Sequence, residues 1–201
     1  MAYGDFTLES IEEKFGVQTR VKKLFGKIKP STPSQRLLDD IEEAKTFPLR
    51  SEKSKSEWVL TPILKELRRS NGSFFTVYSG ELLNVDMASG LNGECDFIIS
   101  KDIGTYTISY PIMQVVEAKK GDIDLGVAQC SAQMIGAKKY NDKKGTPVDM
   151  VYGCVTNGKE YLFLQLTDRI TIDTDSYGLS QLDELLGVFQ TIIDYYKEAL
   201  K

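Results

Sequence analysis

The chain has 201 residues, a net charge of -4 and no histidine. This length fits one domain with a substantial core. The lack of histidine excludes a Ser-His-Asp or Cys-His triad, a histidine general base and metal sites that need imidazole. Any hydrolytic chemistry must therefore use carboxylates, lysine, hydroxyls or a metal ion held by oxygen ligands, which favour magnesium, manganese or calcium.

Signals for membranes, secretion and disulfides are weak or lacking. No window approaches the roughly 18 uninterrupted apolar residues of a membrane span. The acidic N-terminal stretch lacks the apolar region of a secretory signal. Cys95, Cys130 and Cys154 are far apart and odd in number, which favours free thiols in a reducing compartment. We therefore expect a cytoplasmic protein with no membrane partner.

Charge gives a mixed indication about nucleic acids. A net negative charge argues weakly against them, because dedicated phosphate binders are usually basic. Local basic clusters nevertheless occur at 21–29, 68–69, 119–120 and 138–144. Each cluster taken alone fits scattered solvated lysines equally well.

Helical patterns dominate the first third of the chain. Asp5 is expected to cap a short helix that ends at Gly16, and residues 34–47 predict a second helix. A charged link over 50–56 follows. Ser56 is then expected to cap a third helix, which ends at Asn71-Gly72; Pro62 within it either kinks the helix or starts it after Thr61.

Strand-like segments rich in aromatic and β-branched residues come next. Residues 73–83 and 112–119 predict single strands, whereas 95–100 and 105–110 predict a hairpin around the turn at 101–104. The remaining elements are a helix over 125–141, a second hairpin over 150–166 with an Asn157-Gly158 turn, a strand over 169–173 and a long amphipathic helix over 180–200.

This order predicts an α/β fold with a central mixed sheet, helices on its faces and a long C-terminal helix. The apolar stripe of the C-terminal helix indicates core packing or, alternatively, a dimer face. We expect residues 1–50 to be a helical extension packed on a core formed by 51–201, as one compact domain overall.

The segment PIMQVVEAKKGD, at 111–122, suggests a functional site. Strand side chains alternate between faces, so Glu117 and Lys119 share one face with Val115. A carboxylate after an apolar run is costly to bury unless it is paired or binds a metal. Asp96 lies at the edge of another apolar strand, and it can converge with Glu117 if the two strands are neighbours. Two such carboxylates repel unless a cation lies between them.

These residues resemble the PD-(D/E)XK nuclease superfamily, which has the restriction-endonuclease-like fold. The match consists of Asp96 in one strand and Glu117-Ala118-Lys119 at the end of the next, followed by a helix with Gln129 and Gln133. It extends over roughly 56–166 and includes Glu57, which is similar to an extra glutamate in some members. The Pro-Asp of the family is here Cys95-Asp96, and Glu94 and Asp86 are alternatives if the strand is aligned differently.

The resemblance implies a three-layer α/β/α core and a Mg²⁺-dependent (or Mn²⁺-dependent) DNA endonuclease. Asp96, Glu117, the Ala118 carbonyl and Glu57 would then be metal ligands, and Lys119 would orient the attacking water. Gln129 and Gln133 would support the site or contact phosphate. A homodimer would place two such sites on opposite strands, and RNA remains open as a substrate.

Structural alternatives exist for each residue. Glu117 and Lys119 can form a strand-end salt bridge. The triplet alone does not decide, because Glu43-Ala44-Lys45 repeats it in a charged, helix-like segment where both charged groups are ordinary solvated side chains. Asp96 can be an acid beside a turn, and Glu57 can complement a helix dipole. The alternative function is a non-catalytic nucleic-acid-binding or assembly module of the same fold. A phosphotransfer enzyme is a more distant reading, because no P-loop is present.

Overall fold

A seven-stranded mixed sheet forms the centre of the chain in a computed structural model that describes residues 1–201. The strands lie in the order β1-β7-β6-β5-β4-β3-β2. The β4–β5 and β1–β7 pairs are parallel, and the other neighbours are antiparallel. The strands are Thr19–Val21 (β1), Phe75–Leu82 (β2), Glu94–Lys101 (β3), Ile112–Ala118 (β4), Val151–Thr156 (β5), Glu160–Leu166 (β6) and Ile170–Gly178 (β7).

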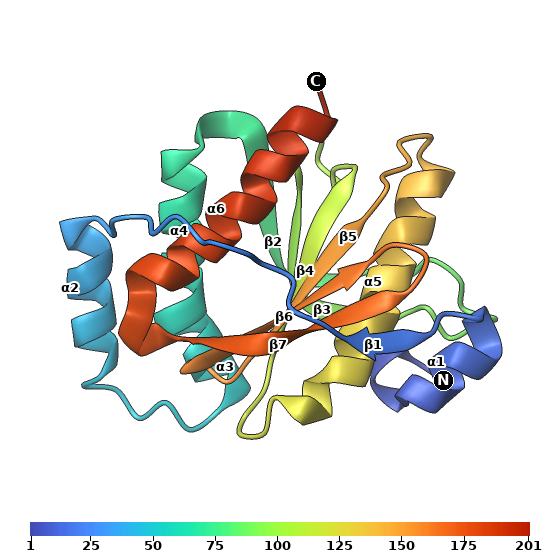
Figure 1. Cartoon of the computed structure of the whole chain (residues 1–201), viewed down its shortest axis with the longest axis horizontal. Coiled ribbons are helices and arrows are strands. Elements are labelled where there is room, and N and C mark those ends of the chain that lie inside the picture. The colour runs from blue at the N-terminus through green and yellow to red at the C-terminus, as the bar shows by residue number, and fades with distance from the viewer.

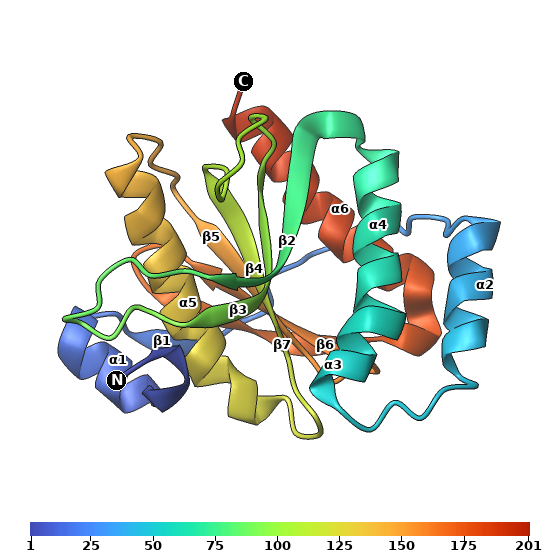
Figure 2. The ribbon, with the colours of Figure 1, turned by 180° about the vertical axis from the view of Figure 1, so that it is seen from behind.

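Helices cover both faces of this sheet, with α1 and α5 on one side and α2, α4 and α6 on the other (Figures 1 and 2). The arrangement confirms the predicted α/β fold with a mixed sheet, and it is consistent with a three-layer α/β/α core. The helices are Leu8–Phe15 (α1), Gln35–Ala44 (α2), Glu52–Lys55 (α3), Thr61–Ser70 (α4), Asp124–Lys143 (α5) and Leu182–Ala199 (α6). Shorter helical segments are Tyr3–Asp5 (η1), Ser56–Leu60 (η2), Gly72–Phe74 (η3) and Leu179–Gln181 (η4).

The two faces of the sheet carry separate hydrophobic cores. Strand β4 contributes to both, because Val115 packs on the α5 side and Val116 on the α4 and α6 side. Every residue of β4 is buried, which explains its nearly continuous apolar sequence. The predicted stripe of α6 is also buried, from Leu182 to Tyr196, so its core-packing interpretation is confirmed.

The predicted hairpin over 95–110 is wrong. Residues 105–110 form no strand, and Tyr106 is fully exposed. Strand β3 pairs instead with β2, from Phe75 opposite Lys101 to Leu82 opposite Glu94, and with β4 on its other edge. Both edges of β3 are therefore occupied, and no hydrogen-bonding edge is left for 105–110.

Two helix starts differ from the predictions. Thr7, not Asp5, caps α1, because the Thr7 side chain accepts the Ser10 N–H, while Asp5 ends the preceding η1. Ser51, not Ser56, caps the helical run that begins with α3, and its side chain accepts the Ser54 N–H. The other predicted helix ends, at Gly16 and Asn71, are confirmed.

Pro62 explains the unusual segment that precedes α4. Proline has no N–H to donate to a carbonyl one turn earlier. Segment η2 is π-helical, and it ends where the Thr61 N–H donates to the Ser56 carbonyl. The widened turn thus lies directly before the proline, and α3, η2 and α4 run on as one interrupted helix. π-helical turns are frequent near functional sites.

The N-terminal region wraps around the sheet. Helix α1 packs near α5, β1 joins the edge of the sheet beside β7, and α2 packs near α4 on the opposite face (Figure 1). Strand β1 was not predicted, because three residues are too short to show a periodic pattern. The helices include none with both the length and the apolar character needed to cross a membrane.

Candidate active site at the end of β4

Asp96 and Glu117 lie on adjacent antiparallel strands. The pairing of Phe97 with Val116 continues outward toward these two acids. The Ala118 N–H donates to Asp96 Oδ2 at 2.7 Å, which ties β3 to the end of β4. The Lys119 N–H donates to the Thr156 carbonyl at 2.7 Å, so the extended backbone continues beside β5 for one residue beyond β4.

Side chains from β4 and α5 form one hydrogen-bonded network. Lys119 Nζ donates to Glu117 Oε1 at 2.8 Å and to Gln129 Oε1 at 2.9 Å. Gln133 Nε2 donates to Glu117 Oε2 at 2.8 Å. The four-residue spacing of the glutamines places both on the α5 face that meets the sheet. The structure therefore brings together Asp96 and these four predicted side chains.

Gly126 allows α5 to lie close to this network. A Cβ at Gly126 would come within 3.0 Å of the Lys119 side chain and 2.5 Å of Val155 Cγ1. Such separations are shorter than ordinary van der Waals contact. The lysine stem is therefore confined between β5 and the first turn of α5, and its ammonium group is directed to Glu117 and Gln129.

Burial dominates the electrostatics of the two acids. Glu117 is 3% exposed, and burial together with the nearby Asp96 raises its pKa to about 7, against opposing effects of Lys119 and Gln133. Burial also raises the pKa of Asp96, against the opposing hydrogen bond from Ala118. The site thus holds two carboxylates whose charged forms are costly and which an added cation would stabilise.

An acidic cavity of about 430 Å³ opens beside Asp96. Its acidic lining residues come from α3, η2 and β3: Glu52, Glu57, Glu94 and Asp96. Glu57 thus lines the same cavity as Asp96, as its predicted role requires. Its side chain remains largely exposed, and its nearest cation is Lys53 at 3.9 Å.

Two residues that the sequence interpretation missed contact the segment after β4. Glu52 Oε1 accepts the Lys120 N–H at 3.0 Å, and Lys55 Nζ donates to the carbonyls of Lys119, at 3.5 Å, and of Lys120. Both were assigned to a polar link because the helix start was placed at Ser56. The Ser-Glu-Lys-Ser pattern at 51–54, with a hydroxyl at the cap and another three residues on, was the signal for the earlier start.

The alternative acids differ in position. Asp86 accepts the Ser89 N–H at 3.1 Å and pairs with Lys139 at 3.2 Å, so its carboxylate is engaged in a separate turn. Glu94 does line the acidic cavity, one strand position outward from Cys95. The contact between Asp96 and the end of β4 makes Asp96 the acid that best matches the predicted pair.

The donor set of this site suits a hard cation. Asp96 Oδ1 accepts no hydrogen bond from the protein, and the cavity offers carboxylate and hydroxyl oxygens without thiols. Both oxygens of Glu117 are already bonded, to Lys119 and Gln133. No three acidic or cysteine side chains gather as a ready ligand group. Metal binding would therefore need Glu117 to exchange one hydrogen bond, with backbone or water oxygens completing the ligand set.

Comparison with known proteins gives a distant similarity but no family. No protein-family model matches the chain. The chain is similar to Crinkler effector protein 1 of Rhizophagus irregularis, with 26% identity over 203 residues. The similarity covers 90% of this chain and 40% of that protein, so the chain spans well under half the length of this relative.

Proposed function

We propose that the chain is a metal-dependent nuclease of the PD-(D/E)XK type, which hydrolyses phosphodiester bonds in DNA. One observation carries the proposal: Asp96, Glu117 and Lys119 converge at the ends of two neighbouring strands, and two glutamines from α5 complete the network. A helix-flanked mixed sheet and an adjoining acidic cavity support it.

The metal would be held by Asp96, Glu117 and the Ala118 carbonyl, with Glu57 reaching it through water. Mg²⁺ or Mn²⁺ bound there would lower the pKa of a coordinated water and neutralise charge that develops on the phosphate. Lys119 is positioned beside Glu117 to orient the attacking water or to stabilise the negative charge of the transition state. Gln129 keeps the ammonium group of Lys119 in place, and Gln133 keeps the Glu117 carboxylate in place.

The test is cleavage of supercoiled, linear duplex and single-stranded DNA, and of RNA, with Mg²⁺, Mn²⁺ or EDTA. Asp96→Asn should abolish metal-dependent cleavage. Asp86→Asn is the matched control, because Asp86 is an acid paired with Lys139 in a separate turn, and it should leave cleavage unchanged. Cleavage that survives in Asp96→Asn, or that needs no metal, would contradict the proposal.

A non-catalytic nucleic-acid-binding or assembly module is the second candidate. The observation in its favour is that both oxygens of Glu117 are satisfied within the protein. It predicts nucleic-acid or partner binding that Mg²⁺ does not alter, and no cleavage of any substrate. Calorimetric titration with Mg²⁺ separates the two candidates, since only the nuclease requires a metal site that is lost in Asp96→Asn.

A cytoplasmic location and a homodimer remain parts of the proposal. The three cysteines are buried, unpaired thiols, which supports a reducing compartment. A dimer would allow both strands of a duplex to be cut, and sedimentation with and without duplex DNA would test it.

A further inference from the structure

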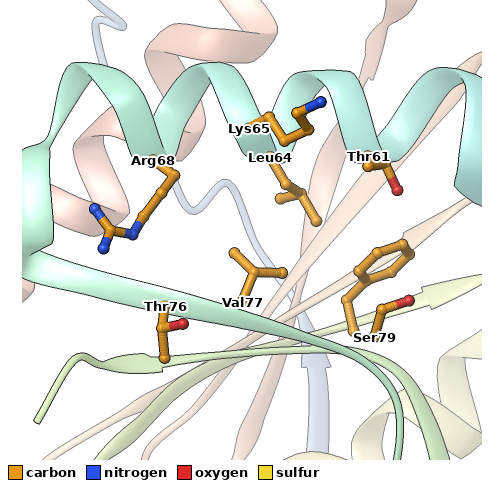
Figure 3. Close-up of a pocket in the computed structure, with 8 residues that line it drawn as sticks. Thr61, Leu64, Lys65, Arg68, Thr76, Val77 and Ser79 are labelled. Atoms are coloured by element: carbon orange, nitrogen blue, oxygen red, sulfur yellow. The ribbon is translucent and has the colours of Figure 1, made fainter. Parts of the chain in front are cut away.

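A second cavity adjoins the acidic one and has the opposite electrostatic character. It has a volume of about 280 Å³ and lies between α4 and the edge strand β2 (Figure 3). Lys65 and Arg68, three residues apart on α4, are its charged residues, and no acidic side chain lines it. The acidic cavity, in contrast, is lined by four carboxylates and a single cation, Lys53. We call this second cavity the α4–β2 cavity.

The two cavities are neighbours with a shared wall. Thr61, Ser79 and Phe97 line both of them. A chain of phosphates that passes Asp96 would therefore meet the α4–β2 cavity next. Each phosphate of a phosphodiester backbone is negatively charged. A metal ion held by the acids could neutralise one phosphate, and the cations of α4 could neutralise the next.

Several polar groups in the α4–β2 cavity have no partner in the fold. Lys65 forms no salt bridge and no side-chain hydrogen bond, and the hydroxyls of Thr61, Thr76 and Ser79 make none either. Arg68 differs, because Asp102 at 3.1 Å and the Gly72 carbonyl hold its guanidinium group. One fixed cation and three free hydroxyls thus line a single space. Lys65 lies at its rim, where its ammonium group is directed away from β2 (Figure 3) and is free to turn toward a bound phosphate.

The wall between these groups is apolar, formed by Leu64, Val77 and Phe97. In Figure 3, the α4 residues lie above the cavity, and Thr76, Val77 and Ser79 lie below it on β2. The volume falls just under the range of about 300 to 1,000 Å³ that is typical for small-molecule sites. It is enough for one nucleotide unit rather than a stacked base pair.

We propose that the α4–β2 cavity binds the nucleotide next to the scissile phosphate, and that the substrate is single-stranded at this position. This inference rests on the proposed nuclease function. Lys65 and the hydroxyls would contact the phosphate and sugar, and the apolar wall would contact the base. A base inside a duplex is stacked on both sides and cannot enter such a space without being extruded.

The experiment measures binding without cleavage. Fluorescence anisotropy in EDTA follows a labelled single-stranded DNA, its RNA counterpart and the matched duplex over a series of salt concentrations. Lys65→Gln should weaken single-strand binding and reduce the slope of log K against log salt by about 0.7, the contribution of one phosphate contact. Thr76→Val, which removes one hydroxyl, should weaken binding without changing this slope. Lys14→Gln, on α1 at the opposite face, is the matched control and should change neither quantity.

The outcomes separate this inference from the proposed function. Cleavage that requires Asp96, together with an unchanged salt slope in Lys65→Gln, would overturn the α4–β2 cavity while the nuclease stands. Lys65-dependent binding without any metal-dependent cleavage would keep the α4–β2 cavity as a single-strand binding site, but it would remove the nuclease and overturn the placement beside a scissile phosphate. Equal losses in Lys65→Gln and Lys14→Gln, duplex binding as tight as single-strand binding, or no binding at all would each overturn the inference.

Discussion

The Glu-Ala-Lys triplet occurs twice in the chain, and the structure places its two copies in opposite environments. At the end of α2, Glu43 and Lys45 are exposed, and Lys45 pairs with Glu42 rather than with Glu43. At the end of β4, Glu117 is buried and Lys119 bonds directly to it at 2.8 Å. The same glutamate and lysine are therefore solvated side chains in one region and a largely buried ion pair in the other.

Backbone geometry explains this difference. Residues two apart lie on the same face of a strand, but they do not face each other on a helix. The extended backbone at 117–119 therefore brings the carboxylate and the ammonium together, whereas α2 separates them. The apolar run before Glu117 then removes water from the pair. The comparison shows that a short motif has chemical meaning only through its secondary structure and burial.

Removal of the lysine ammonium group should distinguish the two triplets most clearly, through its effect on the cleavage rate. Lys119→Ala removes the cation beside Glu117, so metal-dependent cleavage should fall on the order of 10²- to 10³-fold, the loss typical for removal of one transition-state stabilising group. Lys45→Ala removes an exposed cation and should leave the rate unchanged. Cleavage rates of both variants under saturating Mg²⁺ check this. A Lys119→Ala enzyme as fast as Lys45→Ala would reduce the β4 triplet to a structural salt bridge.

Glu117 and Glu43, the acids of the two triplets, should differ in how they affect the pH dependence of the free energy of unfolding. Burial raises the pKa of Glu117 from 4.5 to about 7 in the folded state. Its contribution is therefore fully present below pH 4.5 and is lost as pH rises through 7, with a slope of at most about 1.4 kcal/mol per pH unit. Glu117→Gln should flatten this decline and gain stability relative to wild type above pH 7.

Urea unfolding at a series of pH values in EDTA measures this effect. Glu43→Gln is the control, since Glu43 is exposed and should leave the pH dependence of wild type in place. Parallel curves for Glu117→Gln and wild type would mean that the Glu117 carboxylate is not desolvated in solution.

The sequence predicted the elements that carry the site better than their surroundings. Strand β4, helix α5 and the β5–β6 hairpin each have a strong local signal: an apolar run, an alanine-rich helical spacing and an Asn-Gly turn. Because period and turn chemistry are local properties, these three elements followed from them. The supporting roles of Gln129 and Gln133 came instead from the resemblance to the PD-(D/E)XK superfamily. The failed hairpin at 95–110 depended on which strands pair, and pairing is a property of the whole sheet.

The cavity around the site was much less predictable. Glu52 and Lys55 reach the segment after β4 from a helix more than sixty positions earlier in the chain. Their placement depends on where the helical run begins and on how η2 passes into α4 at Pro62. Neither feature by itself determines how far Glu52 and Lys55 lie from β4. That distance depends on how α3 packs against the sheet, which a sequence pattern does not show.

Added metal should stabilise the protein only by binding at the Glu-Ala-Lys triplet that ends β4. Mg²⁺ bound to the folded state alone would raise the free energy of unfolding by about 2.7 kcal/mol at a concentration 100 times its Kd. Asp96→Asn should abolish this gain, and Glu43→Gln should keep it. Thermal unfolding with and without Mg²⁺ measures both. Equal stabilisation of wild type and Asp96→Asn would place any bound ion outside the predicted site.

The smallest expected effect concerns how the backbone of Lys119 is held. Lys55 Nζ donates to the carbonyls of Lys119 and Lys120, and burial lowers the pKa of Lys55. The next residue, Gly121, is also held, because Asn157 Nδ2 donates to its carbonyl at 3.0 Å. In the proposed nuclease, Lys55 would therefore be a positioning residue that acts through the chain segment and not on the substrate.

Lys55→Met should therefore lower kcat by about tenfold with little change in KM, because a small displacement of a catalytic group slows the reaction more than it weakens binding. Lys55→Arg keeps a donor for the carbonyls and should restore most of the rate. Lys45→Met is the control, since Lys45 is an exposed lysine at the end of α2 that pairs only with Glu42. If Lys55→Met instead raised KM and left kcat intact, Lys55 would contact the substrate directly. Helix α3 would then be part of the substrate-binding surface beside the β4 triplet.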